Sequence, residues 1–119
     1  MRAAPPPNLR PLERALDRAV FLAEVDAWAK RIGVRPRLVT VRPMTRKWGS
    51  CSTAGRVTFD AGLLRQHTDF RSRVIVEELL HLRIPGHGKL FRRLMDAYLK
   101  APPRALCGSG DLPRPSWPR

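Results

Sequence analysis

The sequence predicts a small α+β domain in which a three-stranded, mostly antiparallel sheet packs against helices. Two observations support this fold class. Apolar residues recur at three- and four-residue steps near the N-terminus and again towards the C-terminus, as in amphipathic helices. The segment between them is rich in β-branched residues and contains a tight-turn signal. The length of 119 residues is that of one domain, so the predicted order is helix, three strands, helix, helix.

The N-terminal helix is expected to follow a Pro-rich start, residues 1–7, which we predict to be disordered. Asn8 can cap a helix and Pro11 is tolerated in a first turn, so we predict a helix of about 22 residues. Gly33 is expected to end it. The residues that recur with helical spacing, and that we expect to face the core, are Leu12, Leu16, Ala19, Val20, Ala23 and Ala27.

Three strands are predicted to follow, over residues 37–44, 47–52 and 56–60. The Thr53-Ala54-Gly55 connection between the last two is typical of a tight hairpin, in which the glycine supplies a positive φ. Trp48 and Cys51 lie in or beside the second strand. For both side chains we expect a place in the core.

Two further helices complete the predicted domain, which covers residues 8–100. The first is expected to begin at Asp69, a good N-cap, and to end at Ile84 before a Pro-Gly pair. The second is expected over residues 89–100, with an inward face formed by Leu90, Phe91, Leu94, Met95 and Tyr98. Residues 101–119 form a Pro-rich tail that we expect to be disordered or loosely draped.

The first of these helices carries the chemistry. It is apolar on nearly every side, yet Glu77, Glu78 and His81 share one arc. Buried carboxylates are costly without compensation, which a divalent cation can supply. Residues four apart on a helix lie one above the other, so Glu77 and His81 can chelate one ion, while Glu78 is placed to hold a metal-bound water. The spacing is that of the H-E-x-x-H helix of zinc peptidases, written here as E-E-x-x-H.

His87 is the natural candidate for a third ligand. On an unbroken helix it could not reach the same ion as His81, but Pro85 and Gly86 interrupt the helix and allow the chain to fold back. His67 lies in a polar loop and is not included in the predicted site.

Simpler interpretations of the same residues remain open. Glu77 can pair with Arg73 one turn earlier, and Glu78 can reach Arg71 or an arginine of the first helix. The two histidines can be a core residue bonded to a backbone carbonyl and an ordinary turn residue. The spacing alone does not decide between these pairs and a metal site.

Several motifs in order resemble the YgjP-like metallopeptidase domain, a family related to the SprT-like and WLM zincins. They are the Arg46-Lys47-Trp48-Gly49-Ser50-Cys51 stretch, the hairpin, the E-E-x-x-H helix and the five-residue gap between His81 and His87. Phe91 occupies the family's aromatic position in the next helix. The resemblance spans residues 38–98 and implies a minimal zincin-like fold.

The resemblance also implies a function, the zinc-dependent hydrolysis of peptide bonds in peptide or protein substrates. Glu77, His81 and His87 would then hold one Zn²⁺ per chain, and Glu78 would be the catalytic base that activates a metal-bound water. The family has a histidine where this chain has Glu77. Glutamate is a legitimate zinc ligand, but its negative charge leaves the metal less able to acidify water. We expect the substrate to lie extended along an exposed sheet edge of residues 37–60.

The strong positive charge admits a different function. Lys and Arg number 23 against 10 Asp and Glu, for a formal net charge of +13. Such a surface attracts phosphate backbones, although a GC-rich coding sequence would produce the same arginine enrichment. The alternative function is therefore a degenerate, non-catalytic zincin that acts as a binding module, with nucleic acid as one partner.

Location and redox state follow from smaller signals. The sequence contains no run of about 18 uncharged apolar residues, and its start carries no apolar stretch typical of a secretory signal. Cys51 and Cys107 show no spacing typical of a disulfide framework. We therefore expect a cytoplasmic protein that does not enter a membrane.

Overall fold

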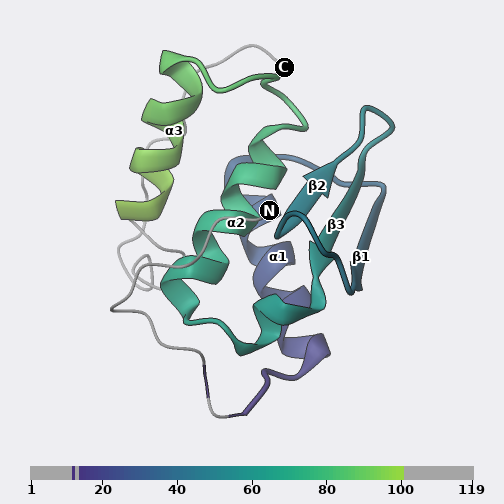
Figure 1. The fold of residues 1–119 in the computed structure, drawn as a ribbon. Coiled ribbons are helices and arrows are strands. Elements are labelled where there is room, and N and C mark those ends of the chain that lie inside the picture. The colour runs from purple at the N-terminus through teal and green to yellow at the C-terminus, as the bar shows by residue number, and fades with distance from the viewer. Residues whose placement is uncertain (1–11, 13, 101–119) are drawn as a thin grey trace.

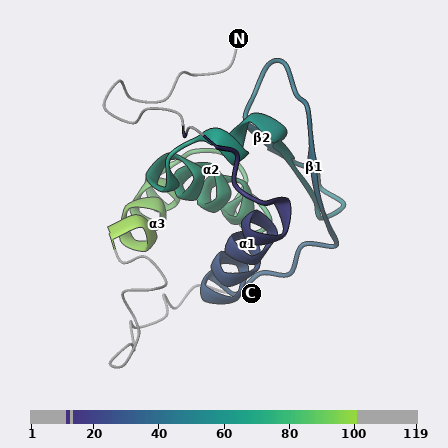
Figure 2. The same cartoon turned by 90° about the horizontal axis from the view of Figure 1, so that it is seen from below.

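The computed structural model describes residue 12 and residues 14–100, and it confirms the α+β class. The elements in chain order are α1 (Arg18–Ile32), β1 (Leu38–Arg42), β2 (Gly49–Cys51), β3 (Arg56–Asp60), the 3-10 helix η1 (Ala61–Arg65), α2 (Thr68–Leu80) and α3 (Lys89–Lys100). The helices lie to one side of the sheet, as Figures 1 and 2 show. α2 packs against α1, α3 and β2, which makes it the central element of the domain.

The sheet is mixed and has the strand order β1-β3-β2. β2 pairs antiparallel with β3, as a hairpin must, but β1 pairs parallel with β3, so the expected mostly antiparallel sheet describes only one of the two pairings. The cause is the connection between β1 and β2, which crosses the end of β3 and leaves room for that strand in the middle. Asp60 holds the crossing: its Oδ1 accepts from the backbone N–H of Met44, and its own N–H donates to the Trp48 carbonyl, both at 2.8 Å.

The N-terminal helix begins later than predicted. Its first residue is Arg18, and Asp17 is the N-cap, whose side chain accepts a hydrogen bond from the backbone N–H of Ala19 at 2.9 Å. Asn8 and Pro11, the predicted start, lie outside the described residues. The chain just before the helix is tied instead to the end of η1 by backbone hydrogen bonds. This attachment draws the segment away from the helix axis.

The inward face of α1 is also different from the predicted one. The buried residues of this helix are Phe21, Val25, Trp28, Ala29 and Ile32. Val20, which we expected to be buried, is 47% exposed. The observed stripe carries the aromatic and large aliphatic side chains, whose burial stabilises the fold more than that of the alanines in the predicted stripe. Gly33 ends the helix as predicted, with φ 84°.

The structure agrees better with the predictions for the remaining elements. β3 and α3 have the predicted bounds, and Gly55 has the expected positive φ of 87° in the hairpin. In α3 the predicted inward residues are buried with one exception, Leu90, which is 54% exposed. Trp48 is half-buried and meets Phe70 edge to face, with ring centroids 5.2 Å apart. Cys51 is half-buried as well. None of the helices among the described residues is long and apolar enough to cross a membrane.

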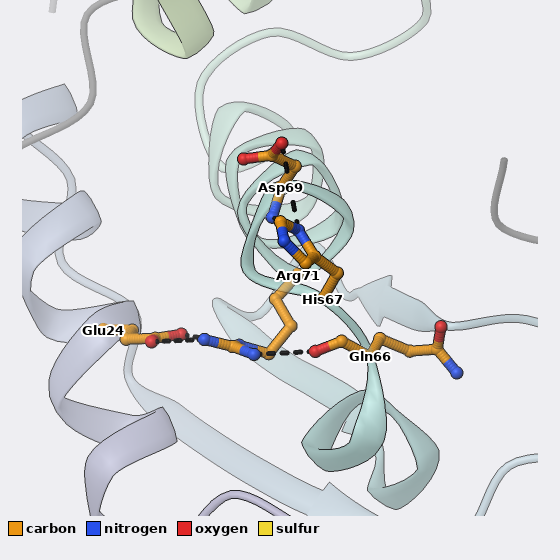
Figure 3. A network of polar contacts seen from close by, with 5 residues as sticks. All are labelled: Glu24, Gln66, His67, Asp69 and Arg71. Atoms are coloured by element: carbon orange, nitrogen blue, oxygen red, sulfur yellow. Dashed lines mark hydrogen bonds and ion pairs between the residues drawn. The ribbon is translucent and has the colours of Figure 1, made fainter. Parts of the chain in front are cut away.

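α2 both begins and ends earlier than predicted. It begins at Thr68, and its N-cap is His67 rather than Asp69: the ring Nδ1 of His67 accepts a hydrogen bond from the backbone N–H of Asp69 at 3.1 Å (Figure 3). The carboxylate of Asp69 lies instead in the first turn, where it favours the positive end of the helix dipole. At the other end, α2 stops at Leu80 and the chain continues in a turn.

A buried arginine joins α2 to α1. The guanidinium of Arg71 donates from Nε and Nη2 to the two carboxylate oxygens of Glu24, at 3.0 and 2.8 Å. Its Nη1 donates to the backbone carbonyl of Gln66 at 2.7 Å (Figure 3). This bidentate pair occupies Arg71, so the structure does not support the interpretation in which Arg71 neutralises Glu78.

Candidate metal centre

The break after α2 brings the two predicted histidines together. His81 is the first residue after the helix and keeps a right-handed helical conformation. Gly86 then turns the chain with φ 79°, in the left-handed region that other residues rarely adopt. His87 returns towards the helix end, and its Nε2 lies 3.2 Å from the Nε2 of His81. The predicted return of His87 to His81 is therefore confirmed, but the helix ends at Leu80, before the Pro-Gly pair that was expected to interrupt it.

Glu77 completes a group of three possible ligands. Its Oε2 lies 3.3 Å from the Nε2 of His87, and the ligand atoms of the three residues all lie within 4.8 Å of one another. Zinc bonds of about 2.0–2.1 Å at tetrahedral angles separate neighbouring ligand atoms by about 3.3–3.4 Å. The contacts of His87 with His81 and Glu77 match that spacing. The donor types and these two separations therefore fit a zinc ion, while the ligand atoms of Glu77 and His81 lie within 4.8 Å of each other.

A backbone carbonyl orients the first imidazole. The Nδ1 of His81 lies 3.2 Å from the carbonyl oxygen of Ile84, in the turn after α2. A carbonyl oxygen only accepts, so Nδ1 carries the proton in the neutral ring. The lone pair of Nε2 then faces Glu77 and His87. This is the usual arrangement around a metal-binding histidine, whose second nitrogen is held by a backbone or carboxylate oxygen.

Phe91 of α3 supports both imidazoles. Its ring stacks on His81, with centroids 4.6 Å apart and an interplanar angle of 21°. It meets His87 edge to face at 4.9 Å. Phe91 is itself 2% exposed, so it forms a rigid apolar wall behind the exposed His87. The aromatic position found by resemblance thus contacts the two imidazoles directly.

Glu78 lies beside this group but is not one of the three converging residues. It is buried between α2 and β2. Burial and the neighbouring Glu77 raise the pKa of its carboxyl to about 7, against an opposing effect of Lys47. Burial and the nearby Glu78 also raise the pKa of the Cys51 thiol. A carboxyl that titrates near neutral pH can both accept and return a proton.

The close contact of β2 with α2 depends on Gly49. A Cβ atom at this position would lie 2.8 Å from the Cγ of Glu78, closer than real Cβ atoms come. The absence of a side chain therefore lets the strand lie directly against the catalytic candidate. Glycine within a strand signals such an approach, so the sequence did contain a sign of this residue's importance. The role of the Ile84 carbonyl could not be predicted from the sequence, because every residue has a backbone carbonyl.

Comparison with known proteins agrees with the site. The sequence model of the family described as "YgjP-like, metallopeptidase domain" matches residues 5–104. No curated protein and no solved structure matches the chain. The matched stretch extends well beyond the motifs, and it contains the candidate Glu-His-His group in full. The chain therefore belongs to the YgjP-like metallopeptidase domain family.

Proposed function

We propose that the protein is a zinc-dependent metallopeptidase. In this proposal Glu77, His81 and His87 hold one zinc ion, and Glu78 is the general base. The observation that carries the proposal is the convergence of three ligand atoms within 4.8 Å of one another beside a buried carboxyl. Membership of a metallopeptidase family supports both a metal and a peptide or protein substrate.

The side chains of the proposed site have different roles in peptide hydrolysis. A bound zinc ion supplies a Lewis acid and lowers the pKa of a coordinated water. Glu78 accepts a proton from the attacking water and returns it to the leaving nitrogen of the substrate. Burial gives this carboxyl a pKa of about 7 in the metal-free protein, and a nearby dication draws that pKa down towards the range of a base. His81 and His87 are held in place by Phe91.

Glu77 alters the balance of charge in this mechanism. One carboxylate and two imidazoles are the same ligand types as in thermolysin, although their order along the chain differs. The carboxylate neutralises part of the ion's charge and lies next to Glu78, whose pKa it raises. Glu78 is therefore a stronger base here than it would be beside a neutral histidine.

β2 is the strand along which we expect the substrate to lie. Among the described strands it pairs only with β3, so its outer edge is free of a partner strand. Gly49, at its start, is in direct contact range of Glu78. An extended peptide that hydrogen-bonds to this edge would bring one of its carbonyl groups towards the site.

Replacing Glu78 by Gln tests the proposal. The amide keeps the shape of the side chain but cannot accept the proton, so hydrolysis of a quenched fluorescent peptide mixture should fall by about 10²–10⁴-fold. The zinc content, measured by elemental analysis, should stay at about one ion per chain. Asp26→Asn, on the exposed face of α1, is the matched control and should leave hydrolysis unchanged.

Two results would contradict the proposal in different ways. Equal hydrolysis by the Glu78→Gln variant would end the general-base role. Zinc binding by the wild-type protein without hydrolysis of any peptide would favour the degenerate, non-catalytic zincin.

A further inference from the structure

A cavity of about 390 Å³ opens next to the candidate metal centre. Three segments that are distant in sequence form it: the loop after α1, the tip of the β2–β3 hairpin and the turn after α2. These segments lie at the same end of the molecule in Figure 1. His81 belongs both to the cavity wall and to the group of converging ligands. A group bound in the cavity would therefore lie beside the site of hydrolysis.

All the charged residues that line the cavity are arginines. Arg35, Arg37 and Arg83 line it, and none of its lining residues is acidic. Ser52 and Thr53 add hydroxyl groups at the hairpin tip. Guanidinium groups bind carboxylates through paired hydrogen bonds, and hydroxyl groups can donate to the same oxygens. The lining is thus suited to an anionic group rather than to an apolar side chain.

Arg37 is held in position by the hairpin. A Cβ atom at Gly55 would lie 3.2 Å from its Cγ and 3.5 Å from its Cδ, so the aliphatic part of Arg37 packs across the glycine. The backbone of the two residues is joined as well, because the N–H of Arg37 donates to the Gly55 carbonyl at 2.8 Å. Contact with the hairpin restricts the stem of this arginine, and such restriction reduces the entropy lost when a ligand binds.

The cavity lies further along the strand proposed to hold the substrate. Gly49 contacts Glu78 at the start of β2, and Ser52 at the other end lines the cavity. Three residues of extended chain cover about 10 Å. A substrate residue two or three positions from the scissile bond would therefore reach the arginines.

We propose that this cavity is a subsite for a carboxylate of the peptide substrate. The peptidase would prefer peptides that carry an anionic group two or three residues from the scissile bond. Two sources share this chemistry: an Asp or Glu side chain, and the terminal carboxylate of a short peptide. The inference rests on the proposed function, because it names the substrate class of the same site.

A set of matched peptides tests the subsite. Peptides identical except for Glu or Gln at each of three positions on either side of the scissile bond, with free or amidated C-termini, are compared by kcat/KM. The wild-type protein should prefer Glu about tenfold at one of these positions, as expected for a charge-assisted hydrogen bond. If amidation lowers kcat/KM by that factor while Glu and Gln are equal, the source is the terminal carboxylate.

The variants assign the preference to the cavity. In Arg35→Gln/Arg37→Gln the preference should fall below about twofold. Arg65→Gln is the matched control, because this exposed arginine precedes α2 and lies at the other end of that helix from His81. It should keep the full preference. Equal kcat/KM for all the peptides in the wild-type protein would overturn the inference while leaving the peptidase function intact.

A binding measurement separates the inference from the proposed function. Fluorescence anisotropy with the labelled Glu and Gln peptides on the Glu78→Gln variant requires no hydrolysis. Tighter binding of the anionic peptide that is lost in the double arginine variant would support the subsite even if no peptide is cleaved. If the double substitution instead weakens binding of a labelled single-stranded oligonucleotide and no peptide preference exists, the cavity serves a phosphate backbone and the inference is wrong.

Discussion

The two ends of α2 carry polar clusters of opposite character. Near its start, Arg71 has a side chain that is 6% exposed and meets Glu24 of α1 in a bidentate ion pair at 2.8–3.0 Å. Near its end, Glu77 and Glu78 are neighbours of like charge. Beside them, the Nε2 of His81 lies 3.2 Å from the Nε2 of His87.

The difference separates stability from function on one helix. The charge at the first end is matched by another element of the fold, so it binds α1 to α2. At the second end the neighbouring carboxyls raise the free energy of the folded protein, and in the proposed function a bound cation would relieve that cost. Changes at the first end should therefore affect unfolding, and changes at the second should affect metal binding.

The largest expected effect is on zinc binding in the His81→Ala variant. Removing one of the three proposed ligands, the one whose Nδ1 is held by Ile84, should lower zinc affinity by at least about 10³-fold, or about 4 kcal/mol. Elemental analysis of the purified protein should show about one zinc per wild-type chain and almost none in the variant. His67→Ala is the matched control and should keep its zinc, since His67 only caps α2. Zinc retained by His81→Ala would remove this residue from the ligand set.

The next effect is a dependence of stability on pH in the metal-free protein. Below about pH 4.5 Glu78 is protonated whether the chain is folded or not. Between there and about pH 7 the unfolded chain ionises while the folded one keeps the proton, so stability falls as pH rises. The loss reaches about 3 kcal/mol and then levels off. Urea unfolding in chelator at a series of pH values should show this decline in the wild-type protein and a smaller one in Glu78→Gln. Identical declines would contradict the raised pKa of Glu78.

A change at the paired end should have the opposite profile. Glu24→Gln leaves the buried guanidinium of Arg71 without its carboxylate, so the free energy of unfolding should fall by about 2 kcal/mol. Denaturant unfolding measures this loss, and zinc content should not change. Asp26→Asn, which removes only an exposed ion pair with Lys30, should cost a few tenths of a kcal/mol. A loss of zinc in Glu24→Gln would show that the two ends are not independent.

The smallest expected effect is a gain at the other end. Glu77→His replaces the carboxylate with an imidazole, which suits zinc well, and removes the negative neighbour of Glu78. Zinc affinity, measured by competition with a chromophoric chelator, should rise about tenfold. Glu78 should also become easier to ionise. An unchanged affinity would argue that Glu77 does not coordinate the ion.

The sequence predicted the positions of the site residues better than it predicted how the surrounding helices and strands begin and pair. The spacing of Glu77 and His81 depends only on helix geometry, and the turn before His87 uses the positive φ of Gly86. Such local geometry does not depend on how distant segments of the chain pack. The roles of the four site residues remain predictions, but their positions agree with the pattern: three converge and Glu78 stands apart.

The errors arose where distant segments decide the outcome. The start of α1 depends on Leu16, whose backbone N–H bonds to the Leu64 carbonyl of a segment far along the chain. The parallel pairing of β1 with β3 depends on the crossing held by Asp60. Arg71 pairs with Glu24, which lies 47 residues away in the sequence. No periodicity or capping rule contains these contacts, because each is a property of the assembled domain.

Phe91 has a consequence for cooperativity. Its ring is part of the hydrophobic core and at the same time touches both imidazoles, so docking of α3 and ordering of the histidines are one event. An ion bound to these imidazoles, as proposed above, would also anchor the last helix, and the local unfolding of α3 would depend on metal concentration. Through this one side chain, occupancy of the proposed site would change the protease resistance and hydrogen exchange of a helix that contributes no ligand.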